Sequence, residues 1–66
     1  MIVAKDSVKE YVNAQKDWKA FSEEIGIARS TLYNIIEGKN VSSDVVAKLL
    51  TKTGFEFEKA FEVKED

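Results

Sequence analysis

Gly26 separates two short segments of helical periodicity, and this arrangement limits the folds that are open to the chain. In residues 17–25 the apolar side chains recur every three or four positions, and Asp17 is a favoured residue at the start of a helix. A second helical pattern fills residues 28–37, and Gly38 is a residue type that commonly ends a helix. Its predicted buried side consists of Ala28, Leu32, Ile35 and Ile36. Helices this short, joined through one glycine, cannot stack antiparallel, so we predict the steep crossing of a helix-turn-helix.

Length and composition favour one small helical domain over residues 1–66. A chain of this size buries only about 60% of the surface that it exposes when unfolded, so its core is small. The absence of proline suits a mostly helical chain. No apolar run approaches the roughly 18 residues that cross a membrane, and the first residues become charged too soon for a signal peptide. We therefore expect a cytoplasmic protein without a membrane partner.

The chain contains neither cysteine nor histidine, and this removes several classes of chemistry. Without thiols it cannot form a disulfide or a thiolate metal site. Without imidazole it lacks the commonest general base and the commonest metal ligand. We therefore expect no catalytic residues, no metal, no cofactor and no enzymatic activity.

Further short helices are predicted on both sides of the helix pair. Ser7 and Glu10 have the spacing of a capping box, which predicts a helix from about residue 7 to residue 15 or 16. Asp44 lies in the first turn of a helix predicted from about residue 43, which Gly54 ends. Residues 55–66 leave two interpretations open, a fifth helix over about residues 57–61 or a strand at residues 61–64 that pairs with residues 2–4. The predicted fold is thus all-α, with four or five short helices and with or without a small pair of terminal strands.

This helix pair resembles the helix-turn-helix of the phage repressor and Cro-type family of DNA-binding proteins. Residues 26–32, GIARSTL, match the family's pattern of glycine, hydrophobic, Ser, Arg, Ser, Thr and hydrophobic residue. Residues 37–40, EGKN, match its closing turn, and the resemblance extends over about residues 6–61. It implies a lambda-repressor-like domain and a sequence-specific transcriptional regulator. The family prior favours a repressor that occupies a two-fold site on double-stranded DNA as a homodimer.

The outward side of the second helix supplies the predicted base contacts, because a recognition helix points its N-terminal residues at base edges in the major groove. These residues are Arg29, Ser30, Tyr33 and Asn34. The Arg29 guanidinium can donate two hydrogen bonds to guanine, and the Asn34 amide can pair with adenine. Tyr33 offers its ring to a thymine methyl group. The alternative is an ordinary solvated helix face, and Glu37, which would repel phosphate, is expected to be a plain surface residue.

By resemblance, phosphate contacts come from the starts of the two helices and from the turn after the second. The predicted phosphate contacts are Trp18, Lys19, Thr31, Lys39 and Asn40. The family usually has an amide at the position of Trp18 and Ser or Thr at the position of Ala28. Trp18 keeps an indole N–H donor, but it is equally a candidate for the core. Lys19, Lys39 and Asn40 are equally compatible with exposed, solubilising side chains.

Charge is distributed unevenly along the chain, whose net charge is −2. Residues 1–54 have a net charge of +1, whereas residues 55–66 have a net charge of −3. The acidity therefore lies away from the predicted recognition helix. The near-neutral remainder lacks a strong basic footprint, which argues against tight non-specific DNA binding.

Three phenylalanines, Phe55, Phe57 and Phe61, fall within seven residues of this acidic tail. They either cover the small core or form a self-association surface, and we predict a dimer interface, because members of the resembled family commonly dimerise through this region. A second interpretation is a small antitoxin-like interaction module. In that case the tail binds a protein partner, and weak DNA binding serves autoregulation. A basic reading frame of toxin size beside the gene would favour the second interpretation.

Overall fold

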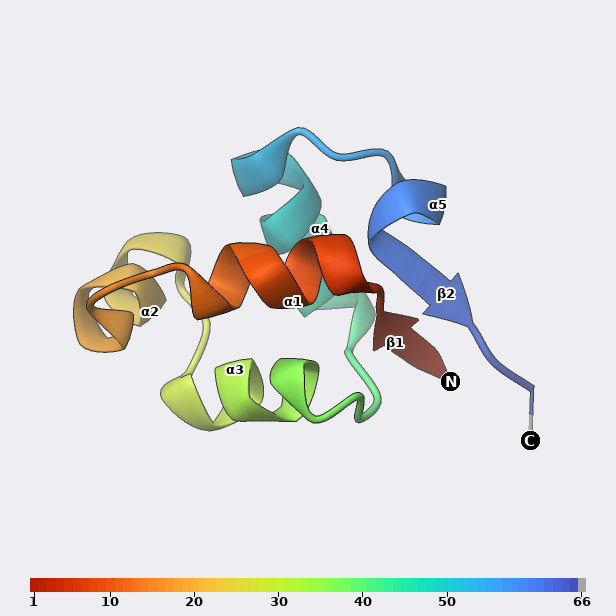
Figure 1. Ribbon diagram of the computed structural model, residues 1–66, viewed down its shortest axis with the longest axis horizontal. Coiled ribbons are helices and arrows are strands. Elements are labelled where there is room, and N and C mark those ends of the chain that lie inside the picture. Colours follow the sequence, from red (N-terminus) through yellow and green to blue (C-terminus); the bar gives the residue numbers. More distant parts are fainter. Residues whose placement is uncertain (66) are drawn as a thin grey trace.

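The computed structural model describes residues 1–65. Along the chain, a short strand is followed by five helices and a second short strand (Figure 1). The elements are β1 (Ile2–Ala4), α1 (Asp6–Asn13), α2 (Trp18–Ile25), α3 (Arg29–Ile36), α4 (Ser43–Thr53), α5 (Phe57–Ala60) and β2 (Phe61–Val63). The predicted all-α fold with a small strand pair is confirmed. Among the described residues, no helix has the length and apolar character needed to cross a membrane.

Both interpretations of the tail are realised, one after the other. The chain forms the single turn of α5 and continues directly as β2. Strand β2 pairs antiparallel with β1, with Ile2 opposite Val63 and Ala4 opposite Phe61. Glu56 precedes α5 without a capping side-chain hydrogen bond, in accord with the poor cap that its long side chain makes. The two strands lie together at one side of the molecule, beside the start of α1 (Figure 1).

Helix α1 begins and ends differently from the sequence prediction. It starts at Asp6, and no side chain caps it. The Ser7 hydroxyl instead donates to the Lys59 carbonyl at 2.7 Å, so the predicted capping box with Glu10 does not form. The prediction was wrong because the helix begins at Asp6, so Ser7 lies inside its first turn and its hydroxyl donates to a carbonyl 52 residues away. The helix ends at Asn13, two or three residues before its predicted end.

One small core joins all the elements. α1 packs against α3, α5 and β1, and α2 packs against α3 and α4. The buried apolar side chains are Val3, Ala4, Val8, Val12, Phe21, Ile27, Leu32, Ile35, Val41, Val46, Leu49, Ala60 and Phe61. Because every helix and both strands contribute to this set, the orientation of α3 is fixed by the whole domain.

Candidate nucleic-acid interface

The joint between α2 and α3 follows from two local signals. The Asp17 carboxylate accepts from the backbone N–H groups of Lys19 at 3.1 Å and Ala20 at 3.2 Å, which confirms it as the cap of α2. Gly26 adopts φ 77° and donates its N–H to the Ser22 carbonyl at 2.9 Å. A side chain at this left-handed position would be strained, so glycine sets the angle at which α3 departs.

The buried side of α3 differs from the prediction at one residue. Leu32 and Ile35 are fully buried and Ile36 is partly buried, as the periodicity predicts. Ala28 is exposed, and Ile27 is the core residue of the turn. Ala28 precedes the first helical residue and has extended backbone, with ψ 147°. Helical spacing therefore does not apply to it, and its assignment to the buried side was wrong.

The outward side of α3 carries three of the four residues predicted to contact bases. Arg29 and Ser30 are exposed in the first turn, and Tyr33 is 57% exposed one turn further on. Asn34 is half-buried. Helix α3 lies at the lower edge of the molecule in Figure 1, with its far side open. The arrangement brings a guanidinium, a hydroxyl and a phenol together on one open face, and their roles toward DNA stay a prediction.

Trp18 is half-buried against the core, and its indole N–H is not free for a phosphate. Its indole Nε1 donates to the Val12 carbonyl in the last turn of α1, at 3.0 Å. Its ring also contacts Tyr33 edge-on, with the centroids 4.8 Å apart and the planes at 61°. The one donor of the indole is thus already used, which corrects the prediction of a phosphate contact. Trp18 instead links α1, α2 and the exposed ring of Tyr33.

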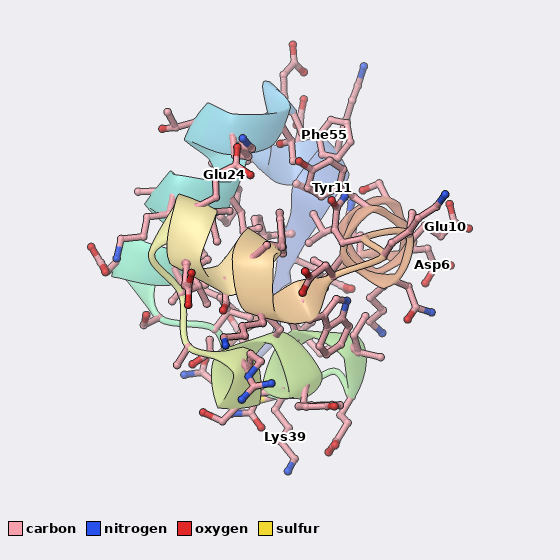
Figure 2. The ribbon with its side chains drawn as sticks, turned by 90° about the vertical axis from the view of Figure 1, so that its left-hand side faces the viewer. Asp6, Glu10, Tyr11, Glu24, Lys39 and Phe55 are labelled. Atoms are coloured by element: carbon pink, nitrogen blue, oxygen red, sulfur yellow. The ribbon has the colours of Figure 1, made fainter. Side chains whose placement is uncertain are left out.

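The other predicted phosphate contacts differ in how free they are. Lys19 is exposed at the start of α2, and Thr31 is half-buried in the first turn of α3. Lys39 extends away from the body of the molecule below α3 (Figure 2) and pairs with Glu37, with 3.1 Å between Nζ and Oε2. An exposed pair of this kind contributes at most about 1 kcal/mol, so Lys39 can exchange its partner for a phosphate. The Asn40 side-chain oxygen accepts from the Ile2 N–H at 2.9 Å and ties β1 to the turn after α3.

None of the protein-family models matches the chain, and no solved structure matches it either. The family resemblance of the helix-turn-helix therefore stays a prediction, and function is inferred from the placement of the side chains.

The three phenylalanines of the tail do not form one exposed surface. Phe61 is 1% exposed and lies in the core, so its assignment to a dimer interface was wrong. Pairing of β2 with β1 sets Phe61 opposite the buried Ala4, which turns its ring inward. Phe57, 39% exposed, stacks on Phe61 with the centroids 5.9 Å apart. Phe55 is also partly exposed and meets Tyr11 edge-on at 6.3 Å, on the opposite side of the molecule from Lys39 (Figure 2).

Val63, on β2, is the apolar residue that the sequence interpretation missed. It is 61% exposed, more than any of the phenylalanines. It lies two residues after Phe61 in the same strand. The core ends at Phe61, however, so Val63 extends beyond the helices that bury its neighbour.

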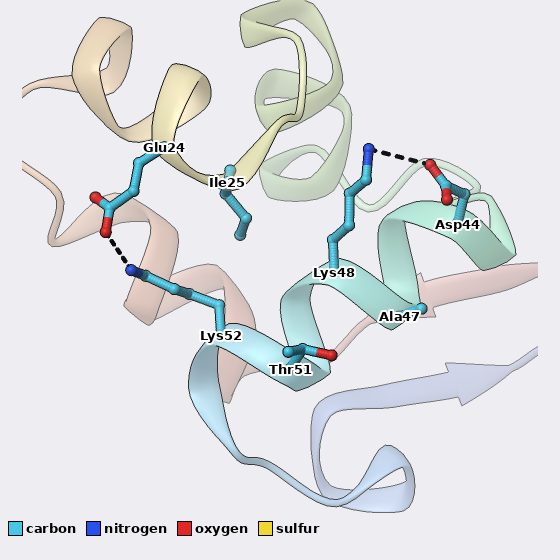
Figure 3. A pocket seen from close by; sticks show the side chains of 7 residues that line it. All are labelled: Glu24, Ile25, Asp44, Ala47, Lys48, Thr51 and Lys52. Carbon is cyan, nitrogen blue, oxygen red and sulfur yellow. Dashed lines mark hydrogen bonds and ion pairs between the residues drawn. The ribbon is translucent and has the colours of Figure 1, made fainter.

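An open groove of about 460 Å³ lies between α2 and α4 and is bordered by ion pairs (Figure 3). Lys52 pairs with Glu24, and this hydrogen bond raises the pKa of Lys52 above its usual 10.5. Lys48 pairs with Asp44 at 3.2 Å and also donates to the Gly26 carbonyl at 2.9 Å. Lys48 therefore connects α4 to the turn between α2 and α3. Helical spacing in the sequence does not predict this contact. Within residues 1–65 no cluster of three acidic side chains is placed to hold a metal ion.

Proposed function

We propose that the chain is a sequence-specific DNA-binding regulator that presents α3 to the major groove. The observation that supports this most directly is the exposure of Arg29 and Ser30 in the first turn of α3, with Tyr33 exposed one turn further on. A recognition helix approaches the base edges with this end. The first turn of α3 contains no acidic residue that would repel the DNA backbone. The resemblance to the phage repressor and Cro-type family supports the same function.

Each exposed group has a distinct chemical use in this proposal. Arg29 donates two parallel hydrogen bonds to the O6 and N7 acceptors of guanine, the commonest specific contact in the major groove. Ser30 bonds either a base edge or a phosphate. Tyr33 meets a thymine methyl group with a ring whose position is fixed by Trp18. Asn34 is a secondary contact, because it is half-buried behind the first turn.

We further propose that the protein acts as a homodimer that represses transcription by occupying a two-fold operator. One short helix reaches only a few base pairs, and affinities near 10⁻⁸ M or tighter usually need a larger footprint. A net charge of −2 does not supply the difference through phosphate attraction. Two copies of α3 held about 34 Å apart would reach successive major grooves on one side of the duplex.

The dimer surface of this proposal is revised around the residues that the fold leaves exposed. Phe57 on α5 and Val63 on β2 are exposed, and within residues 1–65 β2 pairs with β1 alone. An exposed apolar pair beside an open strand edge is a suitable surface for a second copy. The acidic side chains of the tail would lie around its rim.

Selection of bound duplexes from a random pool tests the DNA-binding proposal directly. The wild-type chain should enrich one two-fold motif. Arg29→Ala should then lower the affinity by about 1–3 kcal/mol at a single base pair of each half-site and relax the preference there. Lys52→Ala, which removes a cation from α4 outside the α3 face, serves as the matched control and should keep the motif. A pool without enrichment, or an Arg29→Ala variant with unchanged preference, would contradict the proposed recognition helix.

The second candidate function is an antitoxin-like module that binds a protein partner. It is favoured by the same exposed residues, Phe57 and Val63, because they adjoin a tail with a net charge of −3. A basic partner would cover the apolar pair and neutralise the tail. A basic protein encoded beside the gene should then bind the wild-type chain and lose affinity for Phe57→Lys. A DNA motif recovered in the absence of any partner would favour the first candidate.

A further inference from the structure

An open hollow of about 490 Å³ lies between the start of α1, the turn after α3, α5 and β2. Its charged lining residues are Lys5, Lys9, Lys59, Lys64, Asp6 and Glu62. The lining has a net charge of +2, although the whole chain has a net charge of −2. None of the ion pairs formed within residues 1–65 uses any of these six side chains. The hollow therefore gathers positive charge that the described fold does not neutralise by pairing.

Tertiary contacts bring these lysines together from the two ends of the sequence. The Lys5 ammonium donates to the Glu58 carbonyl, and the Lys5 N–H donates to the Ala60 carbonyl at 2.8 Å. The Ser7 hydroxyl bonds the Lys59 carbonyl, which fixes α5 against α1. Lys64 N–H donates to the Met1 carbonyl at 2.7 Å, beyond the last pair of the β1–β2 sheet. The charge cluster is thus set by the backbone of the fold rather than by a run of basic residues in the sequence.

Lys9 connects this hollow to the proposed DNA face. Its ammonium nitrogen lies 3.7 Å from the point that a Cβ atom on Gly38 would occupy. Gly38 immediately precedes Lys39 and Asn40, the two proposed phosphate contacts of the turn after α3. Duplex DNA carries one negative charge per about 1.7 Å of its axis. A DNA strand that contacts this turn therefore has further phosphates on either side of the contact.

We propose that the four-lysine hollow, formed by Lys5, Lys9, Lys59 and Lys64, binds the DNA phosphodiester backbone beside the recognition helix. This inference rests on the proposed DNA-binding function. It enlarges the surface that contacts DNA and adds no recognition of bases. The hollow is open and its cations stand on different elements, which suits an extended polyanion. Asp6 and Glu62 interrupt the cluster, so the phosphates would follow the lysines rather than fill the hollow.

The salt dependence of DNA binding measures these contacts. Affinities of Lys9→Gln, Lys59→Gln and the double variant would be compared with the wild type over a series of salt concentrations. The probes would be a duplex of about 20 base pairs, two helical turns, with the selected motif and the same duplex with a scrambled motif. Each lost contact should reduce the slope of log K against log salt by about 0.9. Affinity for both duplexes should fall by the same factor, because phosphate contacts carry no sequence information.

Lys52→Gln is the matched control, since it removes the same charge from the α2–α4 groove, outside both the hollow and the α3 face. It should keep the wild-type slope. Glutamine keeps a polar side chain that is one bond shorter than lysine, and circular dichroism would verify that the variants stay folded. A loss confined to the motif duplex would also contradict the inference, because it would indicate base recognition at the hollow.

The outcomes separate this inference from the function on which it rests. Suppose that the wild-type chain binds the motif duplex and that the double variant keeps the wild-type slope of log K against log salt. That result would refute phosphate binding by the hollow and leave the proposed DNA-binding function intact. A wild-type chain that binds neither duplex would refute both. Inorganic phosphate provides a third arm. Saturable chemical-shift changes at Lys9 and Lys59 with phosphate, combined with an unchanged DNA slope, would assign the hollow to a free anion and overturn the assignment to DNA.

Discussion

Truncation of Phe61 to alanine should destabilise the fold far more than the same truncation of Phe57. The two rings are stacked on each other, yet Phe61 is 1% exposed and Phe57 is 39% exposed. Removing a buried phenylalanine side chain costs about 3–5 kcal/mol, because apolar contacts are lost and a cavity remains. At about 0.05–0.15 kcal/mol per residue, a chain of this length has a free energy of unfolding of roughly 3–10 kcal/mol. Phe61→Ala should therefore remove from about a third to all of the stability.

The expected effect of Phe57→Ala follows from its partial burial. Full burial of a phenylalanine side chain contributes about 1.5–3 kcal/mol. With 39% of the residue exposed, about three-fifths of that amount, or about 1–2 kcal/mol, is at stake. The two variants thus differ by at least about 1 kcal/mol, although they remove the same atoms from neighbouring rings.

Urea unfolding followed by circular dichroism and by the fluorescence of Trp18 would measure both losses. The protein concentration should be varied, because the stability of a dimer depends on it whereas that of a monomer does not. Equal losses, or a larger loss for Phe57→Ala at low concentration, would refute the placement of Phe61 in the core. A wild-type midpoint that rises with concentration, and a Phe57→Ala midpoint that does not, would support the proposed dimer surface.

Three further predictions concern other contacts. Trp18→Phe should lower the free energy of unfolding by about 1 kcal/mol, because it removes the hydrogen bond to the Val12 carbonyl, and urea titration measures this loss. Phe57→Lys should give a folded monomer with weaker operator binding, and a wild-type chain that sediments as a monomer at tens of micromolar, roughly where a useful dimer should form, would contradict it. The raised pKa of Lys52 predicts a stabilising contribution that is present below about pH 10.5 and is lost as the pH rises through the folded value. Unfolding midpoints measured toward high pH should therefore fall more steeply for the wild type than for Lys52→Met, and parallel profiles would show that the pair with Glu24 contributes nothing.

Helices α2 and α3 and the turn between them were predictable because their determinants act over a few residues. The Asp17 carboxylate caps α2 through N–H groups two and three residues away, and Gly26 needs only its own backbone to turn the chain. The periodicity of Leu32 and Ile35 then selects the side of α3 that is buried. Ala28 was misassigned because the periodic pattern does not reveal that the helix starts one residue later.

The errors at Ser7 and Phe61 come from contacts between distant parts of the sequence. Ser7 leaves its capping role for a carbonyl of α5, and Phe61 is buried because β2 pairs with the other end of the chain. The Trp18 indole could not be placed without the position at which α1 ends. The four-lysine hollow was not predicted, because Lys5 and Lys64 line one hollow only when the terminal strands pair. A linear sum of charge describes the tail as acidic and does not show the local surplus of cations.

The pairing of β1 with β2 has a consequence for the order of folding. The hydrogen bond from Lys5 N–H to the Ala60 carbonyl closes a loop that contains nearly the whole chain, whereas α2, its turn and α3 need only local contacts. Closing a long loop carries an entropic penalty that grows with its length, so the strand pair should form after the helices have collapsed. Mutations in the strand pair should accordingly accelerate unfolding more than they slow folding, with φ-values near zero. The same proximity of Ile2 and Val63 makes the domain suitable for circular permutation, with a short linker across the strands and new ends in an exposed connection such as residues 54–56.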